Sequence, residues 1–195
     1  VPAESLANGA DLVAFSGDKL LGGPQSGIIA GRRDLIESLR KHPLYRVLRV
    51  DKLTYAALGA TLESFANGTA EDEIPVMQMI NFPREAIKER ATIFAERITS
   101  LDLGISAAVT EGNSVIGGGS APGVHPPTSL IALSHDEMSA DAIESEFRKG
   151  TPPVITRIEN DRVLIDLRTV ANGDEDLLLS AVAAVFSRFA GQNPA

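Results

Sequence analysis

The sequence predicts an α/β protein in two parts: the C-terminal end of a larger α/β domain, followed by a small α+β domain with an antiparallel sheet. An apolar run at residues 12–15 that enters a glycine-rich loop is typical of a buried strand in a mostly parallel sheet, and long helical patterns follow it. Beyond about residue 69, pairs of strand patterns alternate with helices, which indicates an α+β sandwich. We therefore expect domains of residues 1–68 and 69–195.

The first part should hold two strands and two substantial helices. In chain order we predict a short helix over 4–8, strands over 11–15 and 26–30, and helices over 34–41 and 51–65. Pro43 should stop the first long helix, and Asn67-Gly68 is typical of a helix end. Four glycine or proline residues crowd the connection between the strands, residues 16–25, so this loop must be tight and specifically shaped.

The second part should open with an amphipathic helix and close with another. We predict helices over 83–99, 139–149 and 174–189, and strands over 105–109, 115–116, 129–133, 153–158 and 163–167. Ser139 is a suitable N-cap for the middle helix, and residues 159–162 carry a hairpin signal. Gly117, Gly118 and Gly119 should form a turn or bulge, since no Lys-Ser/Thr follows them as in a phosphate loop.

The composition excludes several classes of function. With 18 basic and 26 acidic residues, the net charge of -8 argues against the broad basic surface of non-specific nucleic-acid binding. The absence of cysteine excludes disulfides and thiolate metal sites and fits a reducing cytosol, and the three histidines lack metal-ligand spacing. No apolar run approaches the roughly 20 residues of a membrane span. We expect a soluble, cytoplasmic protein without a membrane segment.

Lys19 lies in the glycine-rich loop, and two interpretations fit it. A lysine beside a turn is usually a solvated surface residue. Alternatively, a lysine amine in a mostly dry site condenses with an aldehyde cofactor. For that role Ser16 could donate to a cofactor phosphate, Gly17 leaves room for close approach, and Asp18 places a carboxylate beside the amine. The residues alone leave both interpretations open.

Arg46 and Arg49 are three residues apart and could lie on one helical turn. Their guanidinium groups could then converge on one oxyanion, such as a phosphate. From the residues alone, a solvated basic face shared with Arg40, Lys41 and Lys52 is the more common explanation and needs no ligand. Separately, Val1 stands where a complete chain begins with Met, and the first residues read as the middle of an α/β domain. We expect the chain to be part of a longer protein.

Residues 11–25, DLVAFSGDKLLGGPQ, resemble the cofactor-lysine segment of the bacterial selenocysteine synthase family, L-seryl-tRNA(Sec) selenium transferase. Further matching segments follow in the same order and spacing over almost the whole chain: His42-Pro43-Leu44 with Arg46, residues 48–52, residues 117–120 with Pro122-Gly123, and residues 152–155 through Arg157 to 164–169. The resemblance implies the C-terminal part of a fold-type-I transferase that depends on pyridoxal 5'-phosphate (PLP), with residues 1–68 ending the PLP-binding large domain.

The resemblance also implies the reaction and the roles of the loop residues. It implies conversion of seryl-tRNA(Sec) to selenocysteinyl-tRNA(Sec), with selenophosphate as the selenium donor. Lys19 would then be the cofactor lysine, with Ser16 and Gly17 also at the cofactor, and Asp18 matches the family's acid/base carboxylate. The functional interpretation of Lys19 is thereby strongly favoured over the surface one.

Three arginines acquire roles from the same resemblance. Arg46 and Arg49 match arginines that bind the anionic donor, so we assign them to selenophosphate. Arg168 lies where related fold-type-I enzymes hold a substrate carboxyl group. Because the seryl carboxyl is esterified to tRNA and carries no charge, a structural salt bridge explains Arg168 about equally well.

The family builds rings of dimers, which implies a homo-oligomer, a decamer in the full-length protein. Its tRNA-binding domain and the remaining cofactor contacts precede the segment matched here, so we expect the chain alone to bind PLP weakly or not at all and to be inactive. Two alternatives stay open. One is a related PLP enzyme acting on a small amino acid or amino sugar, and the other is a non-catalytic α+β interaction module.

Overall fold

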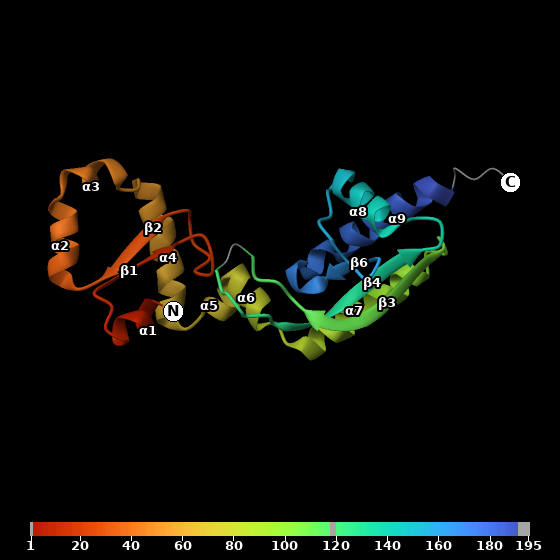
Figure 1. The fold of residues 1–195 in the computed structure, drawn as a ribbon, viewed down its shortest axis with the longest axis horizontal. Coiled ribbons are helices and arrows are strands. Elements are labelled where there is room, and N and C mark those ends of the chain that lie inside the picture. Colours follow the sequence, from red (N-terminus) through yellow and green to blue (C-terminus); the bar gives the residue numbers. More distant parts are fainter. Residues whose placement is uncertain (1, 118–119, 191–195) are drawn as a thin grey trace. The chain divides into compact units, whose positions relative to one another are not determined.

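The computed structural model describes residues 2–117 and 120–190, which form two compact units (Figure 1). The first unit ends at Asn81 and the second begins at Phe82. Residues 69–81, which we expected at the start of the second domain, group with the first unit. The chain is an α/β protein with antiparallel sheets.

The first unit contains one strand pair and six helices among its described residues. Its elements are α1 (Pro2–Ala7), β1 (Leu12–Ser16), β2 (Gly27–Gly31), α2 (Arg33–Lys41), α3 (Pro43–Leu48), α4 (Lys52–Asn67), α5 (Ala70–Glu73) and α6 (Pro75–Asn81). The five elements expected here are confirmed within a few residues. Pro43 does end one helix, but it also occupies the first turn of α3, where its missing N–H costs nothing.

The strands β1 and β2 pair with each other in antiparallel register, Val13 opposite Ala30 and Phe15 opposite Ile28. The expected parallel arrangement is therefore wrong for this pair. The connection between them folds back on itself, whereas a parallel pair needs a crossover of about a dozen residues or more. Neither strand has a fully buried residue, so these strands are less buried than the apolar pattern suggested.

The longest helix of the first unit, α4, has a defined cap at each end. The Asp51 carboxylate accepts a hydrogen bond from the Thr54 N–H at 2.8 Å, which lowers the pKa of Asp51 below its ordinary value. At the other end Gly68 adopts φ +74° and its N–H donates to Phe65 O, a common helix termination. The caps explain why this helix starts and stops close to the expected residues.

The second unit is a four-stranded antiparallel sheet with helices. Its elements are α7 (Arg84–Thr99), β3 (Ile105–Asn113), β4 (Pro127–His135), α8 (Ala140–Lys149), β5 (Arg157–Glu159), β6 (Arg162–Asp166), two 3₁₀ turns η1 (Leu167–Thr169) and η2 (Asn172–Asp174), and α9 (Glu175–Ala190). The strand order is β3-β4-β6-β5. Ser139 caps α8 as expected, and Asn160 and Asp161 form the hairpin turn with positive φ.

Two expected strand segments are wrong. Residues 115–116 and 153–156 lie outside any strand. The ladder between β3 and β4 ends where Asn113 faces Pro127, and Pro126 and Pro127 have no N–H with which to extend it. Pro152 and Pro153 limit the other segment in the same way, so β5 begins only at Arg157. Gly118 and Gly119 of the expected glycine turn lie outside the described residues.

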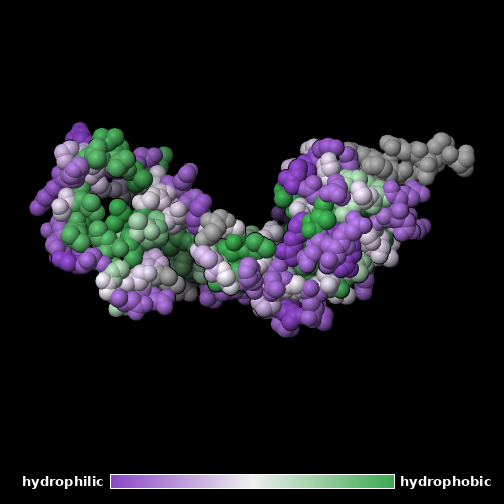
Figure 2. All heavy atoms as spheres, in the orientation of Figure 1, coloured by the Kyte–Doolittle hydropathy of each residue, from purple (hydrophilic) through white to green (hydrophobic). Residues whose placement is uncertain are grey.

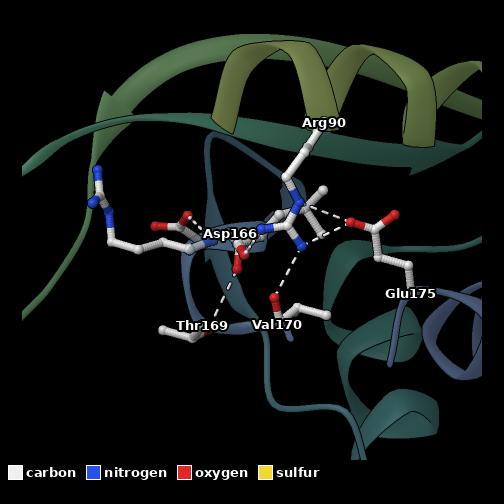
Figure 3. Close-up of polar contacts among 7 residues, drawn as sticks. Arg90, Asp166, Thr169, Val170 and Glu175 are labelled. Atoms are coloured by element: carbon white, nitrogen blue, oxygen red, sulfur yellow. Dashed lines mark hydrogen bonds and ion pairs between the residues drawn. The ribbon is translucent and has the colours of Figure 1, made fainter. Parts of the chain in front are cut away.

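The core of the second unit lies between the sheet and its three long helices. Its fully or almost fully buried side chains include Phe94, Ile98, Ile131, Leu133, Ile143, Phe147, Val163, Val182 and Phe186. Arg90 of α7 ties this core to the C-terminal segment: its guanidinium donates to Glu175 Oε1 at 2.8 Å and to Val170 O at 2.9 Å (Figure 3). The first unit differs, because only Gly17, Ala70 and Ile74 are buried among its described residues.

Apolar side chains lie at the surface of the first unit, and Figure 2 shows them gathered over α3. Val47 exposes 78% of its surface and Leu53 exposes 81%. Within residues 2–117 and 120–190, no helix combines the length and apolarity that a membrane crossing requires.

Candidate functional site

The loop that carries Lys19 is closed by backbone hydrogen bonds. Gly17 N–H donates to Ser26 O at 2.8 Å, Gly23 N–H donates to Gly17 O at 2.8 Å, and Gly22 N–H donates to Lys19 O at 3.0 Å. The last of these makes residues 19–22 a β-turn with glycine at its fourth position, a common preference. The loop is therefore an ordered element, as the density of glycine and proline predicted.

Two glycines in this loop have no room for a side chain. A Cβ on Gly17 would overlap Ser26 Oγ and lie 2.7 Å from Pro24 O. A Cβ on Gly22 would overlap Ile74 Cγ2, and Gly22 has φ +71°, which disfavours other residues. The glycines thus allow close approach of backbone to backbone and of backbone to side chain, rather than leaving empty space.

Lys19 and Asp18 lie side by side at an open pocket. Lys19 Nζ is 3.6 Å from Asp18 Oδ2, and the lysine side chain is 52% exposed. The pocket measures about 300 Å³ and is lined by Ser16, Asp18, Lys19, Gln25, Ser26 and Gly27. Apart from the glycine, each lining residue carries a hydroxyl, amide, carboxylate or amine. Such a pocket suits a small polar ligand that reacts with an amine.

Arg46 lies in α3, and Arg49 is the residue that ends this helix. Both are exposed, no described carboxylate forms an ion pair with either, and neither lines the pocket at Lys19. The hydroxyls of Tyr45 and Tyr55 lie 3.2 Å apart and link α3 to α4. This hydrogen bond raises the pKa of Tyr55. The positive charge of Arg49 acts in the opposite direction and lowers that pKa. Arg49 therefore lies near the tyrosine pair.

Arg168 is only 6% exposed. Its guanidinium donates to Ser114 Oγ at 2.8 Å, to Phe82 O at 2.9 Å and to Pro127 O at 2.7 Å. Ser114 in turn donates to the Asp166 carboxylate at 2.6 Å. Burial lowers the pKa of Arg168, an effect that the Asp166 charge opposes. Arg168 thus connects the start of α7 with the adjoining ends of β3 and β4.

A second pocket, of about 350 Å³, lies on the sheet of the second unit. Arg157 and Arg162 line it together with Glu111 and Glu159, so its charges balance, and it contains none of the expected site residues. Within the described part of the chain, no group of histidine and carboxylate side chains could hold a metal ion. The pocket at Lys19 is therefore the better candidate for chemistry.

Several residues at the candidate site were not predicted from the sequence. Gln25 and Ser26 line the pocket from the far end of the loop, and their nearness to Lys19 follows from the antiparallel return, which the pattern did not predict. Ile74 packs on Gly22 from 52 positions away. Tyr45 and Tyr55 had one usable signal, because they are the chain's two tyrosines and flank Arg46 and Arg49.

The fold of this chain is similar to that of a solved structure. The chain resembles the "Structure of D-Glucosaminate-6-phosphate Ammonia-lyase" with a TM-score of 0.64 over 95% of this chain and 46% of that chain. The two sequences are 21% identical, so the likeness concerns the fold alone.

Sequence comparison identifies the family. The family described as SelA, L-seryl-tRNA selenium transferase, matches residues 1–171. The L-seryl-tRNA(Sec) selenium transferase of Alkaliphilus metalliredigens is 43% identical over 93% of this chain and 39% of its own length. Those of Carboxydothermus hydrogenoformans and Geobacter sulfurreducens are each 40% identical, over 89% and 94% of this chain.

The chain therefore belongs to the L-seryl-tRNA selenium transferase family. It spans about two fifths of the length of the curated relatives that it matches. The resemblance noted in the sequence is confirmed.

Proposed function

We propose that this chain is part of a PLP-dependent enzyme that converts seryl-tRNA(Sec) to selenocysteinyl-tRNA(Sec), with selenophosphate as the selenium donor. The observation that carries the proposal is the pairing of Lys19 with Asp18 on an ordered glycine loop at a polar pocket, in a chain of the selenium transferase family. The tRNA substrate and the donor rest on family membership.

The residues at the pocket fit pyridoxal 5'-phosphate. The exposed amine of Lys19 is available to an aldehyde, and the Ser16 hydroxyl at the pocket can donate to a phosphate, whereas the Ser26 hydroxyl donates to Pro24 O. Gly17 is buried and does not line the pocket, so it would act by letting the loop close rather than by touching the cofactor. When bound, PLP supplies an electron sink for negative charge at the substrate Cα.

Asp18 would handle the proton of the Lys19 amine. A carboxylate 3.6 Å from Nζ can accept a proton from the amine directly or through one water. A lysine must lose its proton before it attacks an aldehyde, so the neighbouring acceptor serves the first chemical requirement of the site. This role needs no other residue of the described loop.

Arg46 and Arg49 would bind the selenophosphate anion. Neither is neutralised by a described carboxylate, and both are exposed, so their charges remain available to a ligand. Guanidinium groups bind phosphate-like oxyanions through paired N–H donors. Because these arginines do not line the pocket at Lys19 within this chain, the proposal requires the donor site to be completed by other segments or another subunit.

Of the two roles open for Arg168, its contacts support the structural one. Three N–H groups already donate to protein oxygens, and the side chain is buried. A ligand carboxyl group would have to displace backbone carbonyls that have no other described donor. Arg168 would then hold the start of α7 against the adjoining ends of β3 and β4 without touching the substrate.

The full-length protein would be a homo-oligomer. The exposed apolar side chains of α3 and α4, among them Val47 and Leu53, support this because solvated monomers rarely keep such groups together. Since the chain spans about two fifths of its relatives, we also propose that alone it binds PLP weakly or not at all and lacks activity.

A PLP titration tests the role of Lys19. The full-length protein that contains this chain, its Lys19→Ala variant and a Lys41→Ala control are titrated with PLP while the absorbance band of the lysine-bound cofactor is followed, and borohydride then traps the adduct for peptide mass spectrometry. We expect Lys19→Ala to abolish the specific adduct and Lys41→Ala to keep it. Equal adducts in all three proteins would contradict the assignment of Lys19.

A further inference from the structure

Of the three buried residues among those described in the first unit, two lie in or against the Lys19 loop. Gly17 lies within the loop, and Ile74, which is 5% exposed, contacts it at Gly22. Elsewhere in this unit large apolar side chains are exposed, with Leu48 at 76% and Leu53 at 81%. The best-packed part of the unit is therefore the part that holds the candidate cofactor lysine.

Ile74 and Val76 lie directly on the Gly22 backbone. A Cβ built on Gly22 would overlap Ile74 Cγ2 and lie 2.9 Å from Val76 Cγ1. Ile74 connects α5 to α6, and its N–H donates to Ala70 O at 3.0 Å, so its own backbone is held by the end of α5. These contacts form a small apolar support on one side of the loop.

The support acts on Lys19 through the turn of residues 19–22. Because Gly22 N–H donates to Lys19 O at 3.0 Å, a displacement of Gly22 would free the lysine backbone. Gly23 N–H donates to Gly17 O at 2.8 Å, so the same displacement would also loosen the opposite side of the loop. Holding the backbone restricts where the amine can lie, and reaction at a defined position gains from such restriction.

We propose that Ile74 and Val76 form an apolar brace against Gly22 and that Ile74 is a positioning residue for the Lys19 amine. The inference rests on the proposed function, since it takes Lys19 as the group that binds the cofactor. It adds a residue that touches neither cofactor nor substrate. Along the chain, the brace lies in the segment that leads into the second unit, with α6 ending at Asn81.

The test compares the full-length protein that contains this chain with its Ile74→Ala, Ile74→Val and Ile98→Ala variants. Ile98 is 1% exposed in the core of the second unit, so its variant removes the same atoms without touching the loop. One measurement is hydrogen exchange at the Gly22 and Gly23 amides. The other is borohydride-trapped PLP at Lys19, expressed as a ratio to the adduct at Lys88, an exposed lysine of α7. Thermal unfolding of each variant establishes the temperature at which all four are folded.

We expect Ile74→Ala to raise exchange at both amides about tenfold, the factor that about 1.4 kcal/mol produces, and to lower the adduct ratio severalfold. In Ile74→Val, the amide exchange and the adduct ratio should both stay close to the parent values. Ile98→Ala should change neither the exchange at these amides nor the ratio. Unchanged exchange in Ile74→Ala would overturn the brace, and raised exchange with an unchanged ratio would overturn the positioning role. A parent ratio near one, with Lys19 trapped no better than the exposed Lys88, would instead count against the proposed function, while exchange would still decide the brace.

Discussion

Gly17 shows why the loop needs glycine at one particular position. It is buried, and a Cβ there would overlap Ser26 Oγ and lie 2.7 Å from Pro24 O. Pro24 O is backbone within a ring-restricted residue, so it cannot move aside as the end of a flexible side chain can. At Gly59 in α4, by contrast, an added Cβ meets nothing within 4 Å, and this residue does not line the pocket.

Gly17→Ala should therefore distort the loop, and Gly59→Ala should not. We expect the first variant to lower the yield of PLP trapped at Lys19 about tenfold, the factor set by about 1.4 kcal/mol of strain, with the second close to the parent chain. Peptide mass spectrometry after borohydride treatment measures both yields. Equal loss in the two variants would show that the crowding at Gly17 does not govern Lys19.

Arg168 offers a second prediction for a single residue. Three acceptors surround a planar guanidinium in fixed directions, which a lysine ammonium cannot reach together. Arg168→Lys should therefore lower the free energy of unfolding by about 2 kcal/mol or more, as measured by urea denaturation. If the substitution left stability unchanged but weakened binding of a carboxylate ligand, the substrate-binding role would be the correct one.

At the scale of elements, α4 depends on a charged cap. The pKa of Asp51 is lowered because its carboxylate accepts the Thr54 N–H. A group whose pKa is lower in the folded state stabilises it above the unfolded pKa, and this contribution is lost as the pH falls through the folded value. Protonation of Asp51 should thus loosen the start of α4 at acid pH.

Asp51→Asn keeps an acceptor but does not titrate. Between about pH 5 and about pH 2, the parent should lose helicity at the start of α4 that the asparagine variant retains. Hydrogen exchange at the Thr54 amide, compared between the two proteins at each pH, measures the difference. The same acid dependence in both would assign it to another group.

The long helices were predicted well with or without a side-chain cap, since the uncapped α2 and α7 also begin within one residue of expectation. The helices at α4 and α8 carry side-chain caps at Asp51 and Ser139, and both begin within one residue of expectation. The short α5 and α6 were missed because four and seven residues are too few to show a helical period. The direction of pairing between β1 and β2 was predicted wrongly, since the residues of a short apolar strand do not encode its partner.

The residues of the candidate site also fall into those that the sequence predicted and those that it did not. Ser16, Asp18 and Lys19 are neighbours in the chain, so their meeting at one pocket could be expected. Ser26 and Ile74 reach the loop through the folding of distant segments, and no local pattern marks such contacts. Membership of a family could be recognised from motif order, but the buried position of Arg168 could be learned only from the structure.

For the whole molecule, the two units differ in how much they bury. The second unit has a continuous core that includes Phe94, Phe147 and Phe186. We therefore expect amides of β4 and α7 to exchange slowly and those of α2 and α3 to exchange quickly, because local stability follows buried apolar contact. Mass-spectrometric hydrogen exchange over the whole chain measures this. Comparable protection of α3 and β4 in the isolated chain would contradict it.

The exposed apolar surface of the first unit leads to a last prediction. Val47 and Leu53 expose 78% and 81% of their surface, so replacing them by serine and glutamine should not remove packing from the folded chain. Each buried Å² of such surface favours association by about 25 cal/mol. The double variant should therefore self-associate less than the parent in sedimentation velocity, with unfolding unchanged or improved.

Leu177→Gln provides the matched control, because Leu177 is 54% exposed on α9 of the second unit. If the surface of α3 and α4 drives association, this control should sediment like the parent at every concentration. Equal behaviour of the double variant and the parent would remove the support that these side chains lend to a homo-oligomer. Reduced association in Leu177→Gln alone would assign the contact to the second unit, and the exposed side chains of α3 would then need another explanation.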